Sequence, residues 1–330
     1  MKLLRSSLFL AAILAVGSQA QPSGQFHLSG PYTHDNLTLF LIHGPNKTNH
    51  NLLTLEEAID QGKVVVYETR NVNELAIENV SNQDVFIESG DIVKGGAQDR
   101  TLKDDLILPG KSGKVSISSF CVEHGRWTRR GNESLDTFGG AHQAVASKEM
   151  KMAVRVKGSQ ADVWAGVAKA QADLARNLHS DPRAAASPTS FVMTMEAPAV
   201  QHSIDGYIQE LAGVVNHQND VVGYAFAING KVNSADIYGS HELFAKLWMK
   251  LLRASAVEAV TSLEAGRKLD MIDAKSVTAA VNDADSGNPS VNDLTARTEV
   301  VTRETPRNVM FETRDRAERG VWVHKSYLAK

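Results

Sequence analysis

The apolar residues of this chain come in short runs separated by turn sequences, and this pattern limits the folds open to it. The clearest case is the pair of runs 221–228 and 232–238, which Asn229-Gly230 joins. Asn-Gly suits the type I′ turn, whose twist matches that of two paired strands. The segment therefore predicts a β-hairpin, and a chain with several such segments is expected to build antiparallel sheets.

The first half contains further strand signals and one helix signal. Alternating apolar residues predict hairpins over 75–87 and over 106–122. Thr54 and Glu57 match a capping box, in which each side chain bonds to the backbone N–H of the other residue, so a short helix should begin there. Additional strands are expected over residues 37–42 and 64–67.

The second half mixes helices with hairpins. Apolar residues at helical spacing predict helices within 160–176 and around 204–211. Ser240 can cap a longer helix, which we expect to be the main packing element of this half because its apolar stripe is wide. The stripe consists of Leu243, Phe244, Leu247, Trp248, Leu251 and Leu252. The remaining expectations are a polar loop over 284–293 and three strands around Thr298, Phe311 and Val321.

Together these signals predict an α+β protein. Residues 21–135 should form an antiparallel, β-rich half, and residues 136–330 a half of mixed helices and hairpins. We expect the two halves to pack as one compact unit. The chain has one cysteine, which cannot form an internal disulfide, so the apolar core alone must hold it folded. A chain of 330 residues is long enough to bury such a core.

Residues 1–20 have the pattern of a secretory signal peptide. Two basic residues precede the apolar run 8–16, and small residues at positions 18 and 20 predict cleavage before Gln21. We therefore expect export to the periplasm or out of the cell. No later segment approaches the roughly 20 apolar residues that a transmembrane helix needs.

The charge of the chain argues against one class of partner. The formal net charge is −3, and loss of the two basic residues of the expected signal peptide would take it to −5. General nucleic-acid binding needs a basic face, so we do not expect it here. A small molecule or a partner protein is the expected ligand.

Polar residues are densest between residues 88 and 127, and we take them as candidate ligand-binding residues. They are Asp91, Lys94, Gln98, Asp99, Arg100, Glu123, Arg126 and Trp127. Gly95-Gly96 allows positive φ, so successive N–H groups could hold an anion, while nearby aspartates could instead hold a hard cation. The alternative interpretation is a tight turn whose charges pair with one another. Trp127 fits either a stacking platform for a ligand or a core position.

Cys121 lies at the end of an alternating strand pattern. His124, three residues later, would point to the opposite face of an extended strand, so a buried and unreactive thiol is favoured over a nucleophile. The histidines show no HExxH or HxH spacing and there is no cysteine pair, so no zinc site is predicted and no residue is assigned to a metal. Gly-x-Ser-x-Gly, the usual hint of a serine hydrolase, is also missing.

Several segments occur in the order found in one protein family. They are GDIVKGGAQDR (90–100), FCVEHGRW (120–127) and GSHELFAKLWMKLL (239–252), with LTLEEAIDQGKVVVYET (53–69) and VNELAIENVSNQDVFI (72–87) in support. Over about residues 35–265 the chain resembles the ARG and Rhodanese-Phosphatase-superfamily-associated protein domain family, where ARG denotes ADP-ribosylglycohydrolase. The family name records genomic neighbours, and the resemblance implies no reaction, cofactor or catalytic residue. This chain has Ala97 where the family usually has Lys, and His124 where it usually has Gln.

Two classes of function remain open from the sequence. The first is an exported binding module for a small molecule or a partner protein. The second is a hydrolase or transferase that uses the polar residues 91–126. Both lead us to expect Asp91, Gln98, Arg100 and Glu123 close together at one end of a β-sheet. The sequence does not indicate a cofactor.

Overall fold

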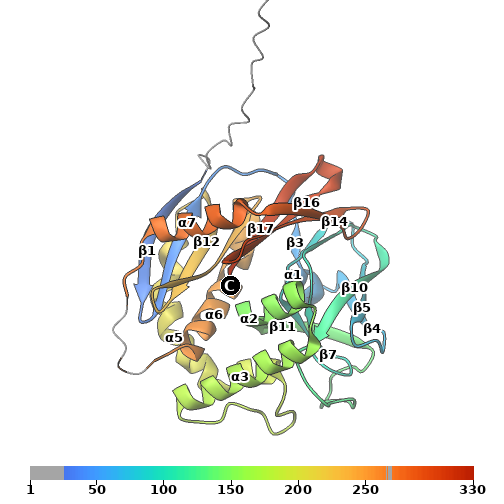
Figure 1. Cartoon of the computed structure of the whole chain (residues 1–330). Helices are drawn as coiled ribbons and strands as arrows, with labels where there is room; N and C mark the ends of the chain where they lie inside the picture. The colour runs from blue at the N-terminus through green and yellow to red at the C-terminus, as the bar shows by residue number, and fades with distance from the viewer. Residues whose placement is uncertain (1–25, 265, 267–269) are drawn as a thin grey trace, which may run out of the picture.

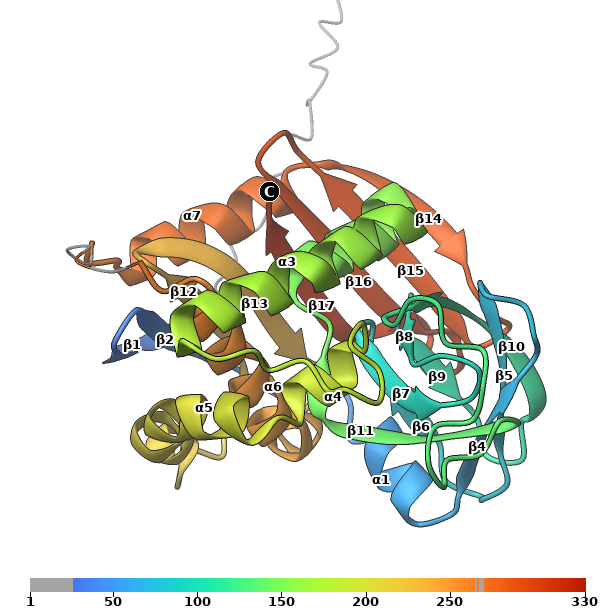
Figure 2. The same ribbon diagram turned by 90° about the horizontal axis from the view of Figure 1, so that it is seen from below.

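The computed structural model of the protein describes residues 26–264, 266 and 270–330. The expected signal peptide, 1–20, lies outside the described residues. Within them a large sheet and a barrel lie next to each other, and helices cover both (Figures 1 and 2). The chain is a mixed α+β protein with antiparallel sheets, as the sequence predicts.

The large sheet has eight antiparallel strands in the order β1-β2-β12-β13-β17-β16-β15-β14. Their bounds are β1 (His27–His34), β2 (Leu37–His43), β12 (Val221–Ile228), β13 (Lys231–Tyr238), β14 (Asn288–Asp293), β15 (Thr298–Glu304), β16 (Asn308–Asp315) and β17 (Val321–Ala329). The two ends of the chain thus meet in one sheet, since β2 and β17 flank the hairpin β12–β13.

Six strands close into an antiparallel barrel in the order β10-β5-β4-β11-β7-β8. They are β4 (Val64–Glu68), β5 (Glu74–Asn79), β7 (Asp91–Gly95), β8 (Arg100–Leu102), β10 (Gly113–Cys121) and β11 (Thr137–Val145). A third, small sheet consists of β3 (Leu53–Thr54), β6 (Val85–Ile87) and β9 (Leu106–Leu108). The pair β3–β6 is parallel. A compact apolar cluster fills the barrel and extends to the small sheet.

Helices cover both faces of the large sheet. The helices of the described residues are α1 (Leu55–Asp60), α2 (Lys148–Met152), α3 (Gln160–Leu178), α4 (Phe191–Met195), α5 (Pro198–Leu211), α6 (His241–Thr261) and α7 (Ala274–Asp285), of which α1 and α4 lie against the barrel. A π-helical turn, Ala153–Lys157, continues α2, and 3-10 turns occupy Ala212–Val215 and Arg316–Glu318. Tyr224 and Phe226 of β12 pack with α6, whereas Ala225 and Ala227 pack with α7. Strand side chains alternate between faces, so β12 is buried along its whole length.

The strongest local signals form the expected structures. Thr54 accepts from the N–H of Glu57, whose carboxylate accepts from the N–H of Thr54, and this completes the capping box of α1. Ser240 caps α6 in the same forward sense. Asn229 and Gly230 have φ values of 53° and 75°, as a type I′ turn requires.

Three local predictions from the sequence are wrong. The runs over 75–87 and over 106–122 are not hairpins, because β5 and β10 pair with each other in the barrel while β6 and β9 pair in the small sheet. The polar segment 284–293 is not a loop throughout, since its second part forms β14. Every residue of β14 is exposed, so this edge strand depends on backbone pairing with β15 rather than on an apolar face.

The halves 21–135 and 136–330 are interleaved in the sheets. β1 and β2 come from the first half and join the large sheet, whereas β11 comes from the second half and closes the barrel. The boundary at 135/136 is therefore a division of the sequence and not of the sheets. No helix in the described part of the chain is long and apolar enough to cross a membrane.

We predict that the buried stripe of α6 is critical for stability. Trp248 and Leu247 are 4% and 2% exposed, and the indole N–H of Trp248 donates to the carbonyl of Ala212 at 2.9 Å. Trp248→Ala or Leu247→Ala should lower the free energy of unfolding by about 2–5 kcal/mol, because each leaves a cavity. The exposed Arg129 is the control, and Arg129→Ala should cost under about 0.5 kcal/mol. Denaturant melts of the three variants test this, and equal stabilities would contradict it.

Candidate functional site

The Gly95-Gly96 turn does not leave its amides free for a ligand. Gly96 has a φ of 52°, and a Cβ there would overlap the ring of Phe138, so only glycine fits. The N–H of Gly95 donates to the Asp99 carboxylate at 3.0 Å, and that of Ala97 donates to Glu68 at 3.0 Å. The carbonyls of Gly95 and Gly96 accept from the Arg126 guanidinium. The turn is thus held by the protein's own charges.

Asp99 and Glu123 are the centre of a buried ion-pair network, the Asp99 network, completed by Arg126, Arg130 and Glu133. Both central carboxylates are 0% exposed. Arg130 binds Asp99 through two bonds, at 3.0 and 2.8 Å, and Arg126 donates to Glu123 at 2.8 Å. Burial tends to raise the pKa of Glu123, but hydrogen bonds from Arg126 and other donors outweigh it and lower this pKa. Arg130 and Glu133 are partners that our candidate set did not include.

Other candidate residues border this network. Arg100 is fully buried, donates to the Gln98 carbonyl at 2.6 Å and lies 3.6 Å from Glu68. The Lys94 amine binds Glu196, at the end of α4, at 2.7 and 2.6 Å. Trp127 is 55% exposed, so the core alternative for this residue is wrong.

Cys121 is buried, as expected, with 1% of its surface exposed. Burial raises the pKa of its thiol above the ordinary value, which keeps the thiolate scarce at neutral pH. The ring of His124 packs edge-on against Trp164, with 4.4 Å between ring centroids. The structure therefore gives His124 a packing role and Cys121 the environment of an unreactive thiol.

Asp91 departs from the expected grouping. It does not join Gln98, Arg100 and Glu123, because its carboxylate binds the Lys250 amine of α6 and accepts from the N–H of Glu88 at 3.0 Å. The sequence alone gives no sign of Lys250, whose helical position marks it only as one of several surface cations. The Lys250 amine meets the Asp91 carboxylate only because α6 packs against the barrel.

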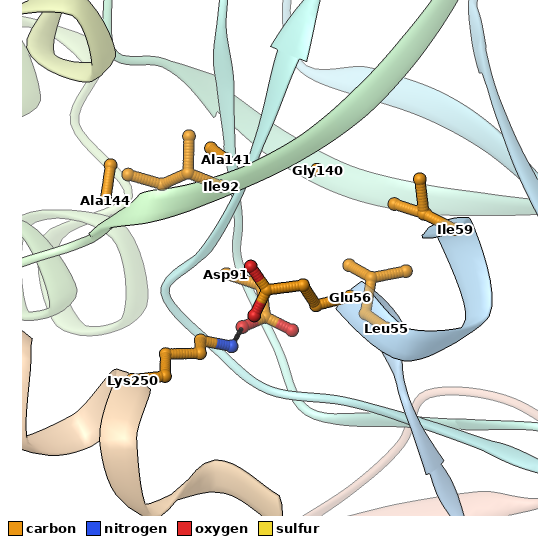
Figure 3. A pocket seen from close by; sticks show the side chains of 9 residues that line it. All are labelled: Leu55, Glu56, Ile59, Asp91, Ile92, Gly140, Ala141, Ala144 and Lys250. Atoms are coloured by element: carbon orange, nitrogen blue, oxygen red, sulfur yellow. Dashed lines mark hydrogen bonds and ion pairs between the residues drawn. The ribbon is translucent and has the colours of Figure 1, made fainter. Parts of the chain in front are cut away.

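Asp91 and Lys250 line a concavity between α1, α6 and the strands β7 and β11, which we call the seam pocket. Figure 3 shows Glu56, Asp91 and Lys250 converging there from three different elements. The other lining residues are Leu55, Ile59, Ile92, Gly140, Ala141 and Ala144. The space inside the seam pocket measures about 10 Å³, which is room for about one water-sized group.

Carboxylates outnumber amines at the seam pocket. Burial disfavours the charged Lys250 amine, but Asp91, Glu88 and Glu56 outweigh this effect and raise its pKa. Glu56 also pairs with His142, whose other ring nitrogen lies 3.3 Å from Asp60. The pocket therefore contains one firmly protonated amine and an excess of carboxylates.

The comparison with known families agrees with the motifs. The model of the ARG and Rhodanese-Phosphatase-superfamily-associated Protein domain, ARPP-1, matches residues 25–328. The chain therefore belongs to this family, and the match also includes the C-terminal strands that the sequence motifs do not reach. Neither a curated protein nor a solved structure matches the chain significantly.

We predict that the Asp99 network stabilises the fold strongly. Arg130→Met should cost about 3–5 kcal/mol, because it removes both bonds from Arg130 to the buried Asp99 carboxylate and one of the two arginine partners of Glu123. The matched control is Arg70→Met, which breaks the exposed pair Arg70–Asp136 and should cost at most about 1 kcal/mol. Urea unfolding at neutral pH measures both values. A similar cost for the two variants would show that the buried network is not needed.

Proposed function

We propose that this protein is an exported binding module whose ligand site is the seam pocket. The observation that carries the proposal is the convergence of Glu56, Asp91 and Lys250 in a concavity with apolar walls. Convergent polar groups on an apolar wall are typical of ligand sites. Export is supported by the basic, apolar and small-residue pattern of residues 1–20.

The Asp99 network is a weaker candidate for the same role. Its carboxylates and guanidinium groups already bond to one another and to nearby backbone carbonyls. A ligand or substrate would have to replace these bonds in a buried place, at a large cost. This favours a binding module over a hydrolase or transferase that acts through residues 91–126.

The charge of the seam pocket favours a cationic group. Asp91 already pairs with the largely buried Lys250, whereas the Glu56 carboxylate is partly exposed at the mouth of the pocket and pairs with the half-exposed ring of His142. Because only one water-sized group fits inside, we infer that an ammonium or guanidinium head pairs with Glu56 at the mouth and that the rest of the ligand lies outside the pocket. The head would belong to a small amine or to a lysine or arginine of a partner protein.

We expect small amines and guanidinium compounds to raise the melting temperature of the mature protein. A ligand at 100 times its dissociation constant adds about 2.7 kcal/mol to the free energy of unfolding. Glu56→Gln should abolish the shift, because it removes the carboxylate at the mouth. Glu210→Gln, at an exposed position of α5, is the control and should keep it. Free amines and a lysine-rich peptide, tested separately, distinguish the two sources of the head group.

A shift that persists in Glu56→Gln would contradict the seam pocket as the site. The absence of any shift with amines, guanidinium compounds or basic peptides would contradict the ligand class.

We also expect the mature protein to begin at Gln21 and to occur in the periplasm or the medium. Mass spectrometry of the N-terminal peptide tests this directly. Ala20→Arg should block cleavage, since the signal peptidase needs a small residue there. Recovery of the wild-type chain from the cytosol with residues 1–20 intact would show the export proposal to be wrong.

A further inference from the structure

Next to the seam pocket, linked to it through Glu88 and Asp91, lies a cluster of buried polar side chains that the proposed ligand site does not need. We call it the central cluster, and it consists of Glu88, Asp105, Asp236 and His324. Glu88 follows β6 and Asp105 precedes β9, whereas Asp236 and His324 lie on the neighbouring strands β13 and β17 of the large sheet. All four are at most 2% exposed. The cluster therefore joins the small sheet to the middle of the large one.

Three members of the central cluster have a polar atom without a hydrogen-bond partner. These atoms are Glu88 Oε2, Asp236 Oδ1 and His324 Nε2. The last two are 3.3 Å apart, and Glu88, Asp236 and His324 each offer a ligand atom within 4.8 Å of the others. An unpartnered buried polar atom costs roughly 1–3 kcal/mol. Three such atoms in one buried group of side chains point to an additional atom that binds there.

The second polar atom of each side chain is held by the protein. His324 Nδ1 lies 2.8 Å from Asp105, which also accepts from Thr313 at 2.7 Å. The Tyr238 hydroxyl donates to Glu88 Oε1 at 2.9 Å, and its ring stacks on His324 with 4.5 Å between centroids. A carboxylate behind a histidine, with the other ring nitrogen facing inward, is the usual support of a metal-binding imidazole.

The charges around the cluster also leave room for a cation. Four carboxylates, Glu88, Asp91, Asp105 and Asp236, face the amines of Lys151 and Lys250, the Arg155 guanidinium beside Asp105 and the imidazole of His324. With a neutral imidazole, the three cations leave one of the four carboxylates without a counter-charge. A metal ion bound by the cluster would supply positive charge there.

We propose that Glu88, Asp236 and His324 bind one divalent transition-metal ion. Two carboxylate oxygens and an imidazole nitrogen suit Zn²⁺, Mn²⁺ or Fe²⁺. Ligand atoms about 2.0–2.2 Å from such an ion lie roughly 3.0–3.5 Å apart, so the Asp236–His324 spacing already fits and Glu88 closes by a small side-chain movement. The ion would tie the small sheet to the large one, independently of any ligand in the seam pocket.

Two other groups of potential ligands are weaker. In the group of His27, His43 and Asp220, both ring nitrogens of His43 already have partners, Ser29 at 2.7 Å and Asp220 at 3.1 Å. In the group of His50, Asp315 and Glu318, the Asp315 carboxylate is held by two bonds from Arg297. Neither group combines burial with three free ligand atoms.

The test is the metal content of the mature protein, purified without chelators from cells grown with added zinc, manganese or iron. We expect about one equivalent of one metal per chain in the wild type. Asp236→Asn and His324→Gln should each lose it, and the control His43→Gln should retain it. Metal that survives in both cluster variants, or that His43→Gln removes, would overturn the proposal.

A second measurement covers variants that do not fold. The wild type, freed of metal by a chelator, should lose melting temperature, and Co²⁺ should restore it with the visible absorption of cobalt bound to nitrogen and oxygen. A wild type with neither metal nor cobalt absorption would overturn the proposal. His324 would then serve as a cation itself: burial lowers its pKa, but Asp105 and Asp236 outweigh burial and raise it to about 10.

Discussion

The contact between Asp105 and His324 is the constraint on which the arrangement of the sheets depends. Both side chains are buried, and removing either would leave a buried polar atom of the other without its partner. Asp105 also binds the hydroxyl of Thr313 and the N–H of Ser89. One carboxylate thus links the small sheet to two strands of the large one. The barrel lies beside this junction, because β7 begins just after Ser89 and β8 ends just before Asp105.

Helix α6 packs beside this junction and contributes Lys250 to the seam pocket. Its apolar stripe packs on β12, while Lys250, on another side of the same helix, reaches Asp91 at the start of β7. An amine between the barrel and a helix is stabilised only where carboxylates surround it, and Glu88, Asp91 and Glu56 do so. The seam pocket and the central cluster are therefore neighbours, linked through Glu88 and Asp91.

The polar residues that stand out in the sequence have two different roles. Asp99, Glu123 and Arg126 form a buried network that holds the Gly95-Gly96 turn. Charges that bind one another in the interior specify a local structure and have little capacity left for a ligand. Asp91 alone among the eight candidates lines the pocket in which we propose that a ligand binds.

Local signals in the sequence determined the capping box of α1, the cap and stripe of α6 and the hairpin at Asn229-Gly230, because each depends on residues a few positions apart. Such signals taken together indicated the α+β class, and several motifs in order along the chain indicated the family. Only the tertiary structure decided which strands pair over 75–122, since β5, β6, β9 and β10 have similar apolar patterns and their partners are set by barrel closure. The same holds for the pocket and the central cluster. Positions 88, 236 and 324 have no spacing to recognise, and they meet because distant strands pack around one buried carboxylate.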